Sequence, residues 1–359
     1  MTSIALLLVS FGVCVLSTRG AIALAHWLTI YDLPDSRKIH TRPVPYLGGV
    51  GLFIAMALMT AVLPWFYPLV FEEVRFLQVL VLTAALVVAF GVWDDVRGSG
   101  AAAKLTLEAL AALLMFRAGV RIDQVAIPGG TAVTLGAAAP VLSVLWYVLL
   151  MNAVNLIDGL DGLAAGISGI GALFIVAFGV AFGDGLALIL ALILAGLCAG
   201  FLVFNFYPAR VFMGDSGSLL LGFVLATITM MSRTKSPTLI VMLVPLIALG
   251  IPVFDSAFAF VRRVFTGTHP FRADQRHLHH RLMGLGLSHK RVVLTLYYIS
   301  LYLGVMAFIL SSTDQWIILL TAVLLGSGLV LLVENISFLE RRRAAGQESQ
   351  HHPQHPDSR

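Results

Sequence analysis

The chain has 359 residues, of which 59% are hydrophobic and 12% charged, and its mean hydropathy is +0.94. A soluble domain carries about 25% charged residues, so a water-soluble core cannot bury this much apolar surface. The composition therefore predicts an all-α polytopic membrane protein. The net charge of +4 comes without a basic arm and gives no sign of nucleic-acid binding.

Apolar segments long enough to cross or enter a membrane recur along the chain, and we count about eleven of them. They cover residues 4–30, 47 onward, 76–93, 105–116, 138–154, 163–181, 186–206, a segment ending near 231, 238–261, 292–310 and 316–338. The first has no basic n-region or cleavage site and is interpreted as a retained span. Residues 1–340 are expected to form one membrane domain, and the polar, His-rich tail 341–359 is expected to be disordered.

Orientation follows from the positions of the lysines and arginines. Most of them fall in loops after odd-numbered spans, which the positive-inside rule places in the cytoplasm. The N-terminus is then outside and the C-terminus cytoplasmic. Short alternating apolar runs around Pro128-Gly129-Gly130 predict a small β-hairpin within 117–136, on the outer side.

The most informative polar stretch is Asn155-Leu-Ile-Asp158-Gly-Leu-Asp161-Gly162, which lies between two apolar segments. Asn155, Asp158 and Asp161 recur every third residue, so an early start of the following helix would project them from one face. Carboxylates at a bilayer edge usually serve a cation or a substrate. A polar turn that caps the next helix is the alternative, but capping explains one Asp rather than this set.

Three other polar motifs fall on the same predicted cytoplasmic face. They are Asp94-Asp95, the stretch 212–218 that contains Asp215, and a loop with Arg272, Arg276, His277, His279 and His280. Taken singly, the acidic pair could be a helix-end ion pair and the histidines a solvated cluster. Their shared face favours one composite site.

Clustered carboxylates need a cation, and oxygen ligands without cysteine suit Mg²⁺, with Mn²⁺ as the alternative. The arginines and histidines of the last large loop could hold phosphates. Backbone amides of 214–218 could add anion donors at a helix start. This combination indicates phosphoryl or phosphosugar transfer onto a lipid.

At these motifs the sequence resembles the polyprenyl-phosphate N-acetylhexosamine-1-phosphate transferases. The resemblance rests on Asp94-Asp95, on 155–163, on Phe212-Met-Gly-Asp-Ser-Gly-Ser218 and on His277-Leu-His-His-Arg-Leu282, which occur in the family's order. It implies a bacterial cytoplasmic-membrane enzyme that transfers a sugar 1-phosphate from a UDP-sugar to undecaprenyl phosphate and releases UMP.

The resemblance also implies residue roles. Asp215 would hold Mg²⁺, with Asp158 joining the metal site, and Asp94 and Asp95 would act in catalysis. Asn155 and Asp161 would help to organise the nucleotide and the metal site, and His277, His279 and His280 would lie near the diphosphate or the sugar. Lys38 is read as a positive-inside anchor, with a role near the lipid phosphate allowed by the resemblance. Family members are often dimeric, which allows a homodimer here.

The histidine motif guides the expected sugar. His-Leu-His-His resembles the branch that starts O-antigen, enterobacterial common antigen or teichoic acid synthesis, because Leu278 interrupts the three consecutive histidines typical of the peptidoglycan branch. UDP-GlcNAc is therefore the expected donor, with UDP-GalNAc and UDP-MurNAc-pentapeptide as alternatives.

Three other classes fit less well. A cation-coupled secondary transporter would place carboxylates near the midplane, often in repeated halves, and no internal repeat is evident. An intramembrane aspartyl protease needs two Asp within membrane-spanning segments and has no use for the loop with the arginines and histidines. A different phospholipid-forming transferase needs a following Arg and two further spaced Asp, and residues 165–182 contain neither.

Overall fold

A computed structural model describes residues 2–34, 42–126, 132–183, 185–231, 282–284, 286–311 and 327. Within these ranges the chain is helical apart from short strands and turns. The helices are α1 (Ser3–Leu28), α2 (Gly48–Phe66), α3 (Val74–Arg97), α4 (Ala101–Arg117), α5 (Ala139–Ile157), α6 (Leu163–Phe182), α7 (Gly185–Asn205), α8 (Gly214–Met231) and α12 (His289–Ser311). Short 3₁₀ helices, η1 (Pro68–Glu73) and η2 (Gly136–Ala138), precede α3 and α5.

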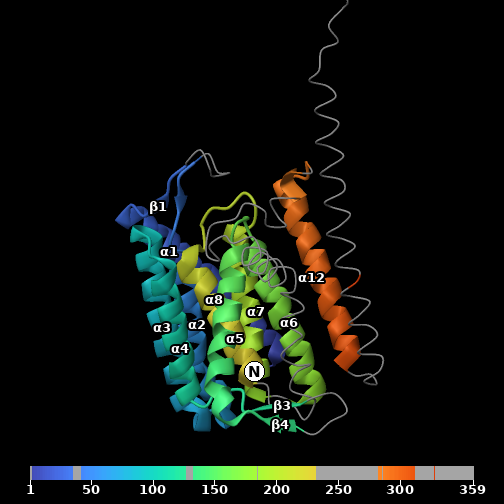
Figure 1. Ribbon diagram of the computed structural model, residues 1–359. Coiled ribbons are helices and arrows are strands. Elements are labelled where there is room, and N and C mark those ends of the chain that lie inside the picture. Colours follow the sequence, from blue (N-terminus) through green and yellow to red (C-terminus); the bar gives the residue numbers. More distant parts are fainter. Residues whose placement is uncertain are drawn as a thin grey trace, which may run out of the picture.

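Two antiparallel strand pairs lie at opposite ends of the bundle (Figure 1). β1 (Tyr31–Asp32) pairs with β2 (Val44–Pro45). β3 (Gln124–Ala126) pairs with β4 (Ala132–Thr134), inside the range in which the sequence predicts a hairpin. The loops on the acidic side of the bundle are thus at the end marked by β1, away from β3 and β4.

Eight helices of the described part are long and apolar enough to cross a membrane. Helix α4, which contains the fourth predicted segment, is shorter than these. The predicted segments 238–261 and 316–338 lie outside the described ranges, apart from residue 327. The all-helical prediction is therefore confirmed in this part of the chain, while the count of eleven and the orientation of the termini stay predictions.

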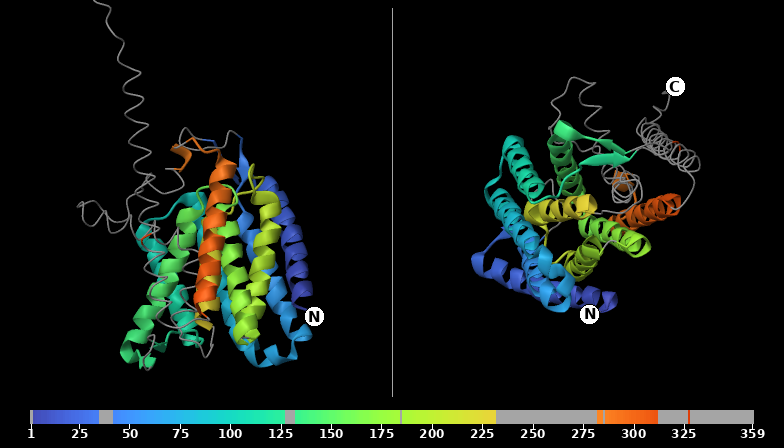
Figure 2. Two further views of the ribbon diagram at one scale, coloured as in Figure 1. Left: turned by 90° about the vertical axis from the view of Figure 1, so that its right-hand side faces the viewer. Right: turned by 90° about the horizontal axis from the view of Figure 1, so that it is seen from below.

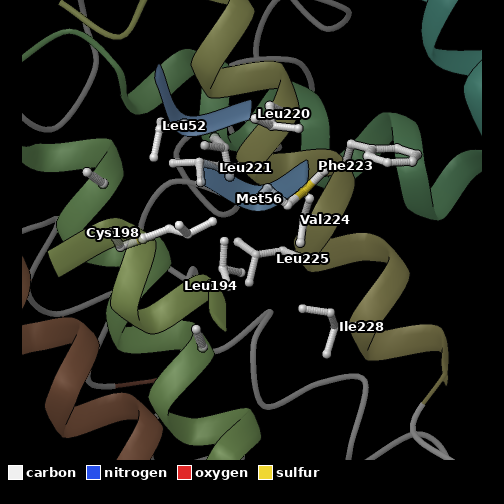
Figure 3. Packing of buried hydrophobic residues seen from close by; sticks show 14 of the residues in the cluster. Leu52, Met56, Leu194, Cys198, Leu220, Leu221, Phe223, Val224, Leu225 and Ile228 are labelled. Atoms are coloured by element: carbon white, nitrogen blue, oxygen red, sulfur yellow. The ribbon is translucent and has the colours of Figure 1, made fainter. Parts of the chain in front are cut away.

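Helix α8 is the central element of the bundle. It packs against α2, α3 and α5, and seen along the bundle axis it lies among the other helices (Figure 2). Its side chains Leu221, Val224 and Ile228 are at most 5% exposed. Figure 3 shows Leu221 and Val224 beside Met56 of α2, and Leu225 of α8 beside Leu194 of α7. Enclosure on all sides explains why α8 is apolar around its whole circumference after its first turn.

Glycines let the start of α8 approach its neighbours closely. A Cβ at Gly49 of α2 would collide with the backbone of Ser216 and Gly217, and one at Gly91 of α3 would collide with Ser216. Main-chain hydrogen bonds add to this contact: Gly48 N donates to Phe212 O and Gly49 N to Met213 O, both at 3.0 Å. The first turn of α8 is therefore fixed by backbone contacts.

Candidate active site

The end of α3, the end of α5 and the start of α8 meet at one end of the bundle. Asp95 Oδ1 accepts a hydrogen bond from Asp215 N at 2.7 Å. Asn155 Nδ2 donates to Asp215 Oδ1 and to Ser218 Oγ, each at 2.9 Å. Motifs far apart in the sequence thus converge on Asp215, as their shared predicted face led us to expect.

The Asp95 side chain, which comes from α3, caps the N-terminus of helix α8. Its Oδ1 bonds the amide of Asp215, and its Oδ2 accepts from the amide of Ser216 at 3.3 Å. A carboxylate at this position satisfies two amides of the first turn and interacts favourably with the helix dipole. The prediction that backbone amides of 214–218 serve as anion donors for a phosphate was wrong for Asp215 and Ser216, because Asp95 already accepts from both amides.

Lys104 supplies a positive charge that was not among the site residues predicted from the sequence. It lies in the first turn of α4, and its Nζ is 2.7 Å from Asp94 Oδ2 and also contacts Asp215 Oδ2. One ammonium thereby links carboxylates of α3 and α8. The available signal was a lysine in a mostly apolar segment that closely follows the Asp94-Asp95 pair and also contains Glu108.

The stretch 155–162 is a helix end and a turn, and the expectation of one continuous helical face was wrong. Helix α5 ends at Ile157, Asp158 follows as its C-cap, and α6 begins only at Leu163. Gly162 has φ of 81°, a left-handed conformation that favours glycine and interrupts the helix. Asn155 and Asp161 consequently reach different partners.

Asp161 and Gly162 bind the loop between α7 and α8. Asp161 Oδ2 accepts a hydrogen bond from Ala209 N at 2.9 Å, and Gly162 N donates to Asn205 Oδ1 at 3.0 Å. Asn205 Nδ2 in turn donates to Val211 O at 2.9 Å. This arrangement ties the turn to the segment that leads into Asp215, a role for Asn205 that sequence reasoning did not identify.

Electrostatics show how closely the acidic groups lie. Burial raises the pKa of Asp158 well above its ordinary value, and the negative charges of Asp215, Asp95 and Asp161 raise it further. The pKa of the Tyr46 phenol is raised by burial and by Asp95, Asp215 and Asp158. Tyr46, next to the start of α2, therefore borders the same acidic region.

The donor chemistry of this region fits a hard divalent cation, because it consists of carboxylate and amide oxygens without a thiolate. In the described ranges, no three His, Cys, Asp or Glu side chains are gathered as a ready-made metal site. Lys104 supplies the positive charge between Asp94 and Asp215. A cation bound at Asp215 would have to share or replace this contact.

The remaining predicted site residues lie outside the described residues. They are Lys38, Arg272, Arg276, His277, His279 and His280. Their predicted roles stay predictions.

Comparison with known proteins gives one family match. The model of the glycosyl transferase family 4 matches residues 77–233, which include Asp94, Asp158 and Asp215. The chain is 35% identical over 287 residues to a probable undecaprenyl-phosphate N-acetylglucosaminyl 1-phosphate transferase of Bacillus subtilis, covering 80% of this chain and 78% of the relative.

Two further relatives differ in how much of the chain they match. A decaprenyl-phosphate N-acetylglucosaminephosphotransferase of Mycolicibacterium smegmatis is 34% identical over 346 residues, covering 88% of this chain and 83% of its own. A phospho-N-acetylmuramoyl-pentapeptide-transferase of Pelotomaculum thermopropionicum is 45% identical, but over 179 residues, 48% of this chain and 52% of its own.

Proposed function

The chain belongs to glycosyl transferase family 4, and from this premise we propose that it transfers N-acetylglucosamine 1-phosphate from UDP-GlcNAc to undecaprenyl phosphate, releasing UMP. The observation that carries the proposal is the meeting of Asp94, Asp95 and Lys104 at Asp215. The relatives named for N-acetylglucosamine transfer match most of the chain, whereas the pentapeptide transferase matches about half. This difference supports N-acetylglucosamine as the sugar.

The proposal includes Mg²⁺ held by Asp215 with Asp158. The support is chemical: both offer carboxylate oxygens, and the pKa of Asp158 is raised first by burial and then by the negative charges of Asp215, Asp95 and Asp161, which a cation would neutralise. When bound, the cation would offset the negative charge of the donor diphosphate. Asn155 orients Asp215 by donating to its Oδ1.

The two members of the acidic pair receive different roles. Both oxygens of Asp95 are bonded to amides of α8, so we assign it to positioning the helix start. Asp94 forms an ion pair with Lys104 through its Oδ2. Its Oδ1 is buried and has no hydrogen-bond partner in the described part of the chain. We propose that Asp94 accepts the proton of the lipid phosphate during attack, which requires its Oδ1 to become accessible when the lipid binds.

The remaining elements of the proposal concern location and partners. Arg272, Arg276, His277, His279, His280 and Lys38 would hold the phosphates and the sugar. The site would face the cytoplasm of a bacterium, because the basic loops share the predicted face of the acidic motifs. The enzyme would work as a monomer or homodimer on a lipid acceptor that stays in the bilayer.

The test is UMP release by purified protein with undecaprenyl phosphate and Mg²⁺. We expect release with UDP-GlcNAc that depends on the lipid and is abolished by EDTA. UDP-GalNAc and UDP-MurNAc-pentapeptide form the comparison arms, and faster release with either would reassign the sugar.

Two variants complete this assay. Asp215→Asn should lose activity while unfolding at nearly the temperature of the unmodified protein. Asp123→Asn is the matched control, because Asp123 is exposed and precedes β3 at the far end of the bundle. Full activity of Asp215→Asn would overturn the assignment of Asp215 as a metal ligand. If the folded protein released no UMP with any of the three donors, the proposed reaction would be overturned.

A further inference from the structure

A buried carboxylate that the proposed reaction does not use lies in α4. Glu108 is 0% exposed. Its Oε2 accepts a hydrogen bond from Asn152 Nδ2 of α5 at 2.6 Å. Its Oε1 is buried and has no hydrogen-bond partner among the described residues. Leaving a carboxylate oxygen buried and unbonded is costly, so the position calls for an explanation.

Glu108 lies one helical turn after Lys104 on the same face of α4. Side chains four residues apart on a helix are neighbours, with about 5–6 Å between their Cβ atoms. The ammonium of Lys104 now points to Asp94 and Asp215. Its four-carbon stem is flexible, so rotation about side-chain bonds can carry the ammonium from these carboxylates toward Glu108.

Lys104 and a divalent cation would compete for the Asp215 carboxylate, whose other oxygen, Oδ1, already accepts a hydrogen bond from Asn155. Lys104 Nζ contacts Asp215 Oδ2, and Asp215 is the metal ligand of the proposed function. Two positive groups cannot share one carboxylate oxygen at contact distance without strong repulsion in a partly buried site. Entry of the cation therefore requires the ammonium to move to another acceptor.

We propose that Lys104 exchanges with the divalent cation at Asp215, and that Glu108 receives the displaced ammonium. This inference rests on the proposed metal role of Asp215. Glu108 is then a positioning residue that acts through Lys104. Asn152 fixes Glu108 by bonding one oxygen and leaves Oε1 for the ammonium. Without a divalent cation, Lys104 keeps the carboxylates of α3 and α8 together.

The experiment measures binding of Mn²⁺ to the purified full chain in detergent, without donor or lipid, from the electron paramagnetic resonance signal of free Mn²⁺. Lys104→Met removes the competing charge and should strengthen binding about tenfold, equivalent to one lost ion pair of about 1.4 kcal/mol. Glu108→Gln keeps an oxygen for Asn152 but loses the charge that receives the ammonium. It should weaken binding by at least about threefold.

The double variant separates positioning from a structural role. If Glu108 acts through Lys104, adding Glu108→Gln to Lys104→Met should leave Mn²⁺ affinity unchanged. If Glu108 only joins α4 to α5, Glu108→Gln should weaken binding by the same factor in both backgrounds, and the proposal is overturned. Thermal unfolding of every variant in the same detergent verifies that each is folded.

Asp215→Asn distinguishes failure of the exchange of Lys104 from failure of the proposed metal role of Asp215. Loss of Mn²⁺ binding in Asp215→Asn, with no strengthening in Lys104→Met, would overturn the exchange and leave the metal site intact. Equal binding in Asp215→Asn and the unmodified protein would overturn both. The supporting result has three parts. Mn²⁺ binding is stronger in Lys104→Met and lost in Asp215→Asn, and Glu108→Gln no longer changes Mn²⁺ affinity when it is combined with Lys104→Met.

Discussion

Asp95 holds the first turn of helix α8, in which Asp215 is the second residue, by accepting a hydrogen bond from the backbone N–H of Asp215 at 2.7 Å. The bond joins the end of α3 to the start of α8 and sets where the Asp215 carboxylate lies. Asp95 is therefore a structural residue as well as a member of the acidic pair.

Removing this cap should destabilise the protein. Asp95→Ala is expected to lower the free energy of unfolding by about 0.5–2 kcal/mol, the usual cost of losing a helix cap. Asp95→Asn should lower the free energy of unfolding by less, because the amide oxygen of the new side chain still accepts a hydrogen bond from one N–H. Unfolding in detergent followed by tryptophan fluorescence measures the difference. Asp123→Ala, at an exposed ion pair, is the control and should change little. An Asp95→Ala variant as stable as this control would contradict the capping role.

Gly91 should tolerate no side chain. A Cβ there meets the backbone of Ser216 in α8, which cannot yield as a flexible side chain could. We expect Gly91→Ala to cost about 1–3 kcal/mol and to lower activity, because the first turn of α8 must shift. In Gly20→Ala the new methyl meets open space on α1, so stability should stay the same or rise. Equal unfolding temperatures for the two variants would refute the close-packing argument.

Asp158 should make stability depend on pH when no divalent cation is present. Its pKa is raised in the folded protein by burial and by Asp215, Asp95 and Asp161, whereas an unfolded chain releases this proton near pH 4. Stability from protonated Asp158 is therefore present at low pH and is lost as the pH rises from about 4 through the folded-state pKa.

The matching measurement compares the unmodified protein with Asp158→Asn across this range in EDTA. The variant should gain relative stability as the pH rises, because its side chain has no proton to lose. A difference that is constant with pH would contradict the raised pKa. Added Mg²⁺ should shrink the difference, since a nearby cation favours the ionised carboxylate.

Tyr297 offers a test of how α12 is attached. Its hydroxyl donates to Gly162 O at 2.5 Å and so joins α12 to the turn before α6. Tyr297→Phe should lower the free energy of unfolding by about 1 kcal/mol. Tyr298→Phe is the control, because Tyr298 is 70% exposed on the same helix. Equal effects of the two substitutions would show that this hydrogen bond contributes nothing.

Composition and motif order predict the helical membrane fold and bring Asp94-Asp95, 155–161 and Asp215 to one end of the bundle. Apolar segment length and charge in loops carry this information, because a chain that crosses repeatedly alternates its faces. The local form of 155–162 was not predictable in the same way. Spacing by three suggests a helical face, but the left-handed Gly162 and the bond from Asp161 to Ala209 favour a turn.

Lys104 and Glu108 show the other limit of sequence reasoning. Both lie in a short helix with an ordinary apolar pattern, so nothing in their spacing separates a surface pair on one helix from groups directed inward. Whether Lys104 and Glu108 face the site depends on which face of α4 packs against α3, α5 and α8. The packing of whole helices determines this. A similar limit applies to Asp95, whose bonds to α8 depend on the close contact at Gly91.

The bonds between residues 45–49 and 212–213 are made by main-chain atoms: Phe212 N donates to Pro45 O, and Gly48 and Gly49 donate to Phe212 and Met213. The position of Asp215 is therefore insensitive to side-chain identity at Tyr46 and Phe212. Replacing either aromatic residue should therefore leave in place the main-chain hydrogen bonds that position Asp215, although the two rings also pack edge to face. The glycines at 48 and 49 lack this freedom, so variation in this segment should concentrate at its aromatic positions.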